Sequence, residues 1–180
     1  AVMGKELDWS QGKGPNYPVY NVSHTEAVEF CTRLTALARQ QVPGFRGEIG
    51  LPTEAQWEYA CRAGTTTAYC CGDDEGKLGE FAVFDGNSGN TNQPVKSKKP
   101  NRWGLYDMHG SVWERCGDWY ADKLPGGKDP RGTSRGSIRV SRGGSWRLSA
   151  WDCRSADRDW SSPGDRGGVG LGFRCAVSGW

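Results

Sequence analysis

Two segments in the first third of the chain have the hydrophobic period of amphipathic helices. Residues 23–41 carry apolar side chains every three or four positions, and Ser23 with Glu26 makes the capping box of a helix start. Residues 52–64 repeat the same device and end in glycine. The pattern therefore predicts two helices over these ranges.

The remainder of the chain alternates short apolar runs with long polar stretches. Runs rich in β-branched and aromatic residues at 111–121, 135–144 and 171–178 predict strands of a small antiparallel sheet. Residues 64–81 and 85–104 are full of Gly, Asn and Pro, which predicts long loops. Loops of this length are uncommon in compact domains and are usually functional, so we expect irregular segments to do the work of this protein.

Length and composition indicate one α+β domain over residues 1–180. The 27 glycines and nine tryptophans describe a chain rich in turns and held together by large aromatic side chains. The net charge of +2 arises from mixed signs, so we expect no nucleic-acid partner and no membrane insertion. The chain begins without an initiator methionine, so we expect a missing N-terminal segment, and the compartment, cell surface or cytoplasm, stays open.

The cysteines and histidines argue against a zinc site and against a Ser/His catalytic triad. The seven cysteines are odd in number and unevenly spaced, and the adjacent Cys70 and Cys71 lack CxxC spacing. His24 and His109 are the only histidines. Cys31 lies on the apolar face of the first predicted helix, where we expect a small buried hydrophobe.

Residues 142–174 have a composition that local folding does not explain. They include six arginines, four aspartates and three tryptophans, with neither a helical period nor a strand alternation. The motifs RVSRGGSW, CRSADR and GFRC in and beside this stretch follow GLPTEAQWEYACRAG and NRWGLYDMHGSVWERCGDWY in the chain. Together the five motifs, in this order, closely resemble the formylglycine-generating-enzyme and sulfatase-modifying-factor family. The resemblance runs from about Val19 to Cys175 and implies a C-type-lectin-like fold, with two helices, short twisted antiparallel sheets and long loops.

The resemblance to the enzymes of this family breaks at the metal-binding cysteines. Those enzymes bind copper through two cysteines after the RGGS motif, and the matching positions here are Leu148 and Cys153. Leucine offers no thiolate, so a two-coordinate soft-metal site cannot form from this pair. We therefore expect no copper and no enzymatic activity.

A second branch of the fold matches residues 142–174 better. The stretch is similar to the C-terminal variable region of proteins diversified by diversity-generating retroelements, in which chosen codons are rewritten within a fixed frame. Fixed frame positions here include Ala150, Arg158 and Arg166. The positions between them share no chemical theme, as expected of residues that carry binding specificity. These predicted ligand-binding residues are Arg147, Leu148, Ser149, Trp151, Asp152, Asp157, Asp159, Trp160, Ser161, Ser162, Asp165, Gly167 and Gly168.

Two features of this stretch admit a purely structural interpretation. At frame positions, Arg142, Arg154, Arg158 and Arg174 are expected to hold buried carboxylates and loop carbonyls through forked hydrogen bonds. Trp151 and Trp160 could be core residues, but they sit among Asp, Ser and Gly, the composition of a binding surface. We therefore predict that both tryptophans are displayed.

The sequence thus favours a non-catalytic ligand-binding domain that displays a variable C-terminal surface on a C-type-lectin-like scaffold. Its ligand would be a protein or a cell-surface glycan. A formylglycine-generating-type oxidase and a structural or regulatory domain of a larger signalling protein are the alternatives.

The family resemblance also implies a structural calcium ion in the YDMHGSVWE turn. Carried over residue by residue, the ligands would be the carboxylates of Asp107 and Glu114 and the carbonyls of Gly110 and Val112. Calcium accepts such mixed oxygen donors in flexible geometry. The alternative is that the two carboxylates make ordinary loop hydrogen bonds.

The resemblance further implies that Cys61 and Cys175 are adjacent in space, because these positions form a disulfide in some family members. Cys116 and Cys153 could be a second neighbouring pair.

Overall fold

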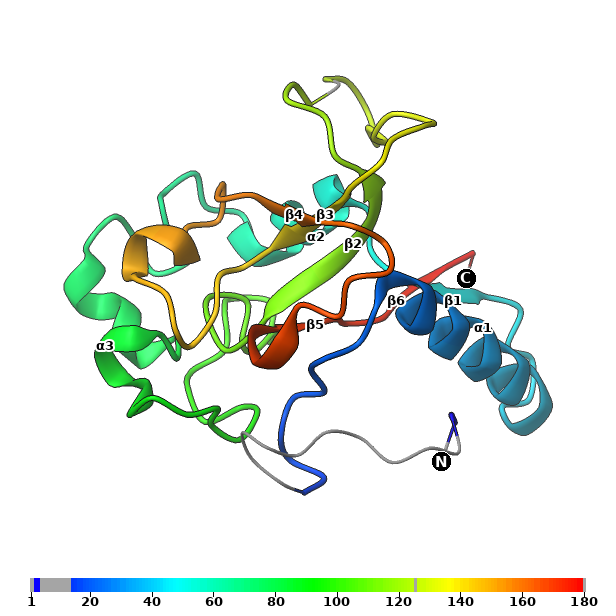
Figure 1. The fold of residues 1–180 in the computed structure, drawn as a ribbon, viewed down its shortest axis with the longest axis horizontal. Helices are drawn as coiled ribbons and strands as arrows, with labels where there is room; N and C mark the ends of the chain where they lie inside the picture. Colours follow the sequence, from blue (N-terminus) through cyan, green and yellow to red (C-terminus); the bar gives the residue numbers. More distant parts are fainter. Residues whose placement is uncertain (1, 4–13, 125, 180) are drawn as a thin grey trace.

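Both predicted helices form, with the predicted caps. The computed structural model, which describes residues 2–3, 14–124 and 126–179, has α1 at His24–Gln41 and α2 at Glu54–Arg62 (Figure 1). Each helix begins with a reciprocal capping box. α2 ends because Ala63 adopts a left-handed conformation, with φ at +46°.

Six short strands form two sheets in the part of the chain that the structure describes. The central sheet has the order β4-β3-β2-β5, and a separate pair joins β1 to β6 (Figure 1). The bounds are β1 (Glu48–Gly50), β2 (Trp113–Trp119), β3 (Arg139–Arg142), β4 (Asp159–Ser161), β5 (Leu171–Gly172) and β6 (Ala176–Ser178).

The sheets depart from the sequence prediction in two ways. The predicted strand 171–178 is split, because its first half joins the central sheet as β5 and its second half pairs with β1. β2 and β5 are parallel, so the central sheet is mixed, whereas an antiparallel sheet was predicted. Alternation along one strand cannot reveal either difference, since the direction and identity of the partner strand are set by the long connections between them.

Short helical turns lie in the two segments predicted as loops and in residues 142–174. Their bounds are η1 (Glu75–Glu80), α3 (Asp85–Ser88), η2 (Ala150–Cys153) and η3 (Gly168–Gly170). Local side chains start these turns, as where the Asp74 carboxylate accepts the N–H of Gly76 at 2.9 Å.

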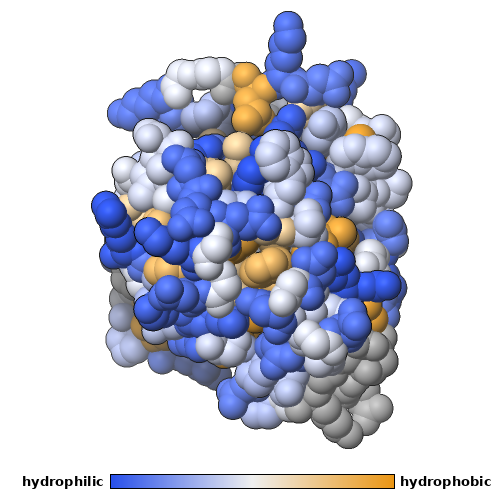
Figure 2. Space-filling model, turned by 90° about the vertical axis from the view of Figure 1, so that its left-hand side faces the viewer, coloured by the Kyte–Doolittle hydropathy of each residue, from blue (hydrophilic) through white to orange (hydrophobic). Residues whose placement is uncertain are grey.

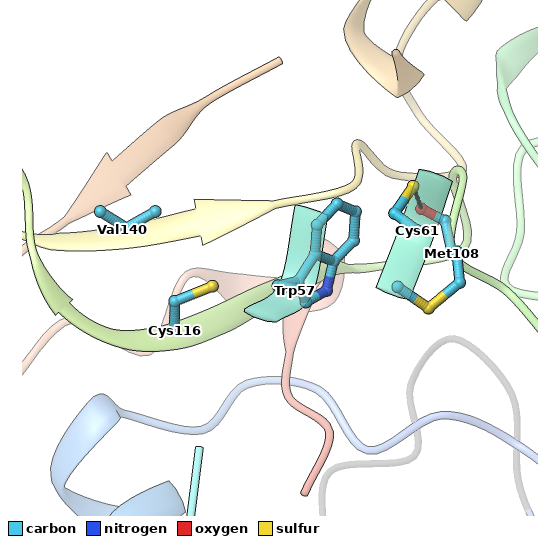
Figure 3. Packing of buried hydrophobic residues seen from close by; sticks show 5 residues of the cluster. All are labelled: Trp57, Cys61, Met108, Cys116 and Val140. Atoms are coloured by element: carbon cyan, nitrogen blue, oxygen red, sulfur yellow. Dashed lines mark hydrogen bonds between the residues drawn. The ribbon is translucent and has the colours of Figure 1, made fainter. Parts of the chain in front are cut away.

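The core is built around Trp57 of α2. Its ring is 1% exposed and lies between Cys116 with Val140 on one side and Cys61 with Met108 on the other (Figure 3). The indole N–H donates to Glu114 at 2.7 Å, so the polar edge of the ring is satisfied where it is buried.

His109 ties three loops to this core. Its Nε2 accepts the backbone N–H of Cys70 at 3.1 Å, which places the ring proton on Nδ1, and Nδ1 donates to the carbonyl of Cys153 at 2.8 Å. Burial lowers the pKa of His109 to about 4, so the ring is neutral at physiological pH.

The residue after His109 must be glycine. Gly110 has φ at +74°, and a Cβ there would lie 2.0 Å from the carbonyl oxygen of Val83.

The face around α3 and η2 is mostly hydrophilic, with small separate apolar spots (Figure 2). No helix in the described part of the chain is long and apolar enough to cross a bilayer.

Candidate ligand-binding groove

Buried arginines fasten the predicted variable segment to α2. Arg142 is fully buried, and its guanidinium pairs with Glu54 and Glu58 and donates to the carbonyl of Asp157. Arg158 forms a bidentate pair with Glu54, with N···O distances of 2.6 and 2.9 Å. Since Glu54 is 3% exposed, the segment is held by desolvated charge pairs.

Two further frame arginines, Arg154 and Arg174, are structural as well. Arg174 pairs with Glu114 and donates to the carbonyl of Tyr106 at 3.1 Å. Arg154 forms an ion pair with Asp157 at 3.1 Å and donates to a local carbonyl. The prediction that these arginines hold carboxylates and loop carbonyls is therefore confirmed by the geometry.

Arg115 supports the same segment, although no sequence pattern pointed to this residue. It is fully buried on β2, and its guanidinium donates to Val22, Ser161 and the carbonyl of Asp165. Burial lowers its pKa to about 10, which leaves it charged at neutral pH. Arg115 therefore fixes β4 and the turn after it to the core.

The two tryptophans in question are displayed. Trp151 is 65% exposed and Trp160 is 53% exposed, whereas the frame residue Trp146 is buried at 4%. The guanidinium of Arg154 stacks on the Trp151 ring, 3.5 Å from the ring centroid. The core interpretation of Trp151 and Trp160 is therefore wrong.

Most of the thirteen predicted ligand-binding positions lie at the surface. Leu148, Asp152 and Asp157 are half-buried, and Ser161 is buried. The exposed positions are Arg147, Ser149, Trp151, Asp159, Trp160, Ser162, Asp165, Gly167 and Gly168.

Seven of the thirteen positions line one hollow, which we call the β4 groove. It has a volume of about 430 Å³, and β4 supplies one wall with Asp159 and Trp160. The residues that line it are Trp113, Ser145, Arg147, Leu148, Asp159, Trp160, Ser161, Asp165, Gly167, Gly170 and Leu171. The groove thus combines aromatic and aliphatic surface with one arginine and two carboxylates.

Three predicted positions have structural roles that the sequence did not reveal. Ser161 is 9% exposed and its hydroxyl accepts from Arg115 at 2.8 Å, because its side chain points inward from β4. Gly167 has φ at +64°, and a Cβ there would lie 2.3 Å from Leu171. Asp157 is committed to Arg154. These three positions therefore support the backbone of the segment, and their part in ligand binding stays a prediction.

Leu148 and Cys153 occupy different environments. Leu148 lines the β4 groove, whereas Cys153 is fully buried in a cluster with Tyr69, Leu78 and Ala82. Burial raises the pKa of the Cys153 thiol to about 12. The groove wall therefore carries an aliphatic side chain, and the thiol lies in a separate buried cluster.

Three of the four predicted calcium ligands, Asp107, Val112 and Glu114, help to line a second cavity of about 410 Å³, whereas Gly110 is not among its lining residues. Asp107 accepts the N–H of Lys96 at 2.8 Å, and burial raises the pKa of its carboxyl group. Glu114 is already paired with Arg174. Carboxylate oxygens are ligands that calcium accepts, but both oxygens of Glu114 accept hydrogen bonds from Arg174, and the calcium site stays a prediction.

The predicted neighbourhood of Cys61 and Cys175 is wrong. Cys61 is fully buried, and its sulfur contacts His109 and Ser155 at 3.6 and 3.7 Å. Cys175 is exposed beside Cys31, with its Sγ 3.8 Å from the Cys31 Sγ. Cys61 on α2 faces the core, so the cysteine next to Cys175 is Cys31 on α1.

Cys116 and Cys153 are not a pair either. They belong to separate hydrophobic clusters, one around Trp57 and one around Tyr69. All seven cysteines are free thiols. Cys31 is buried as predicted, at 2% exposure.

Several groove residues could not be found from the sequence. Trp113, Gly170 and Leu171 line the β4 groove only because β2 and β5 lie side by side. Glu54 lies in the first turn of a helix, where an acidic residue is ordinarily an exposed partner of the helix dipole. Its burial could have been suspected only from the excess of arginine in the later segment.

Known proteins with similar sequences include formylglycine-generating enzymes, a protein named inactive C-alpha-formylglycine-generating enzyme 2, and protein kinases. The formylglycine-generating enzyme of Thermomonospora curvata is 37% identical over 204 residues, covering 98% of this chain and 63% of the enzyme. Serine/threonine-protein kinase pkn1 of Chlamydia pneumoniae is 38% identical over 144 residues, covering 74% of this chain and 22% of the kinase. The chain spans roughly half to three fifths of the length of the formylglycine-generating enzymes it matches.

These relatives correct one expectation from the sequence. The chain was expected to have no enzymatic activity, because Leu148 replaces the first copper-binding cysteine. Proteins named formylglycine-generating enzyme are 33 to 37% identical to it over 90% or more of its length, which contradicts that expectation.

The fold and the family are both established by the comparisons. The solved structure of Treponema denticola variable protein 1 matches with a TM-score of 0.86 and 33% identity, covering 97% of this chain and 78% of that protein. This match confirms the predicted α+β fold of the C-type-lectin-like type and the likeness to a variable protein. The FGE-sulfatase family profile, described as the sulfatase-modifying factor enzyme 1-like domain, matches residues 3–178. The chain therefore belongs to the family of sulfatase-modifying factor enzyme 1-like domains.

Proposed function

We propose that this protein is a ligand-binding domain of the variable-protein type, and that the β4 groove with its rim is the binding surface. The observation that carries the proposal is the division of labour within residues 142–174. Frame arginines are held in ion pairs, with Arg142 buried and Arg158 half-buried against carboxylates of α2, while nine predicted specificity positions are exposed. Such a division lets side chains at the surface vary while the backbone beneath them stays fixed.

The composition of the groove suits recognition of a protein or a cell-surface glycan. Exposed tryptophan and arginine are the residues in which interfaces concentrate binding energy. Trp160, Arg147 and Asp159 line the same hollow, so a ligand would meet an aromatic face, a cation and a carboxylate together. Rewriting of these positions by a diversity-generating retroelement is part of the proposal.

The proposal is tested by titration calorimetry against ligands found on a glycan array and a panel of purified surface proteins. Trp160→Ala is expected to weaken binding at least about tenfold, or about 1.4 kcal/mol. Trp151→Ala should act similarly if the ligand extends beyond the groove to η2, where Trp151 lies. Trp103→Ala is the matched control, because Trp103 is 46% exposed and lies outside the groove.

Unchanged affinity in Trp160→Ala, Trp151→Ala and Arg147→Ala would show that the ligand contacts another face. The same result would withdraw the assignment of the β4 groove as the binding surface.

Formylglycine-generating oxidation is the second candidate, and the names of the relatives favour it. The substrate would be a sulfatase-type cysteine peptide, and the β4 groove offers a hollow in which a peptide segment could lie. Incubation of such a peptide with the protein and Cu(I), followed by mass spectrometry, separates the two candidates. Formation of the aldehyde would establish the second candidate, and binding without conversion would favour the first.

A structural calcium ion held by Asp107, Gly110, Val112 and Glu114 is proposed as an accessory to this fold. The two carboxylates face the cavity of about 410 Å³ described above, close to the turn that precedes β2. The cation would offset the repulsion between the negative charges of Asp107 and Glu114. Its contribution would be to the stability of the turn.

A further inference from the structure

A hollow separate from the β4 groove lies between α2 and the connection from β2 to β3, and we call it the α2 groove. It consists of two adjoining cavities of about 260 and about 610 Å³. Both cavities are lined by Ala55 and Tyr59 of α2 and by Pro130 and Arg131 of the connection. No described residue lines both this groove and the β4 groove. The α2 groove is therefore a surface of its own.

The connection from β2 to β3 projects from the body of the protein, but its base is fastened to α2 (Figure 1). The carboxylate of Asp118 accepts the N–H of Glu54 on α2 at 2.6 Å and the N–H of Gly132 in the connection. Trp119 also forms an isolated β-bridge with Thr133. Both walls of the groove are thus positioned before a partner binds, which keeps the ordering cost of association low.

Exposed apolar side chains gather at the α2 groove. Of the eight large hydrophobic side chains exposed in the described part of the chain, three lie in the groove or at its edge. Tyr59 is 68% exposed and Leu124 is 48% exposed. Trp103 packs edge-on against the Tyr59 ring, with the ring centroids 4.8 Å apart. Such a cluster on the surface of a folded domain indicates a site of protein–protein contact.

The charged side chains of the groove leave one cation and one anion unpaired. The carboxylates of Glu54, Glu58 and Asp118 are satisfied within the chain by arginines and backbone N–H groups. Arg131 and Asp129, in contrast, are exposed and form no ion pair with any residue that the structure describes. The groove therefore offers one free charge of each sign beside its apolar surface.

This combination of charges is complementary to itself. A partner with charges of one sign would leave either Arg131 or Asp129 desolvated without a counter-charge, which is costly. A second copy of the chain, related by a two-fold axis, presents the same two charges in the reverse order, so each arginine meets an aspartate. The exposed rings and aliphatic side chains of the groove would be covered in the same contact.

We propose that the α2 groove is the interface of a symmetric dimer of this chain. Tyr59 and Leu124 of each copy are buried against the other copy, and Arg131 of each copy forms an ion pair with the partner's Asp129. Because a groove between one helix and one loop buries little surface, the dissociation constant is expected in the micromolar range. The dimer leaves both β4 grooves open, since the two kinds of groove share no described residue.

Sedimentation-velocity ultracentrifugation of the whole chain tests the proposal at chain concentrations from about 1 to about 100 μM. The wild type is expected to shift from a monomer of 19.7 kDa to a dimer of twice that mass. Tyr59→Ser should remain monomeric, because it removes the most exposed apolar side chain of the groove. Val28→Ser is the matched control and should dimerise like the wild type, since Val28 is 43% exposed on α1, outside the groove.

A charge exchange tests the ion pairs themselves. Arg131→Asp and Asp129→Lys should each weaken dimerisation at least about tenfold, because each variant places like charges opposite one another. An equimolar mixture of the two variants should restore the dimer, since every reversed charge then faces the opposite sign. Restored dimerisation would also show that both variants are folded.

Three outcomes would overturn the proposal. A wild type that stays monomeric at all concentrations would leave a different protein as the occupant of the groove. Dimerisation that Tyr59→Ser leaves unchanged would place the contact on another face, and loss of the dimer in Trp160→Ala would identify that face as the β4 groove. A mixture of the two charge variants that stays monomeric would exclude the ion pairs on which the choice of a second copy rests.

Discussion

The two buried histidines are expected to make this fold sensitive to mild acid. The Nε2 of His24 donates to the carbonyl of Cys116 at 3.2 Å, and His109 bridges two loops from inside the core. Burial lowers the pKa of each to about 4, from an ordinary value of 6.5. Both rings are therefore neutral in the folded state down to a pH at which an exposed histidine is already charged.

The direction of the effect follows from proton uptake. As the pH falls below 6.5, the unfolded chain binds a proton at each histidine, whereas the folded chain does not until about pH 4. The stability that the neutral rings contribute is thus fully present above pH 6.5 and is lost as the pH falls toward 4. Between about pH 7.5 and about pH 5, this costs about 2 kcal/mol for each histidine and about 4 kcal/mol for both.

Carboxyl groups act in the opposite direction at lower pH. Burial raises the pKa of Asp107 and of Asp157, so the folded state takes up protons there more readily than the unfolded state. Their contribution to stability grows as the pH falls into the carboxyl range. If unfolding free energies are compared only down to about pH 5, the stability gained from these two aspartates contributes little to the measured difference.

Urea unfolding at the two pH values measures the loss for the wild type, His24→Gln and His109→Gln. We expect the pH-dependent loss to fall from about 4 to about 2 kcal/mol in each variant, whatever its stability at neutral pH. The readout is a difference within one variant, so an overall loss of packing does not imitate it. An unchanged pH dependence in both variants would refute the reasoning, as would imidazole NMR signals that titrate near pH 6.5.

Two further predictions concern the frame and the calcium turn. Arg158→Ala should lower the free energy of unfolding by about 3 kcal/mol, because it leaves the buried Glu54 with a poorer partner. Arg166→Ala breaks an ion pair whose arginine is 53% exposed, so it should lower the free energy of unfolding by less than about 1 kcal/mol. Equal losses would show that the segment is not held through Glu54. Calcium at about 100 times its Kd should raise the thermal midpoint by about 5 to 10 °C in the wild type and not in Asp107→Asn, and EDTA should lower stability without abolishing ligand binding. No shift with calcium in the wild type would remove the ion from the proposal.

The sequence alone determined the elements whose signals are local. The capping boxes at Ser23 and Thr53 specify where α1 and α2 begin, because cap and helix are neighbours in the chain. The runs that became β2 and β3 were recognisable for the same reason. The exposure of Trp151 and Trp160 also followed from their polar sequence neighbours.

Tertiary structure alone decided which distant residues meet. The parallel pairing of β5 with β2, the burial of Glu54 beneath Arg142 and Arg158, and the inward turn of Ser161 all depend on contacts across the chain. Composition showed that residues 142–174 were unusual, but only the packed fold divided them into anchors and displayed side chains. Cysteine pairing shows the same limit. Cys175 meets Cys31 and not Cys61, because α2 turns Cys61 into the core while α1 presents Cys31 to the C-terminal strand, and sequence separation carries no information about that orientation.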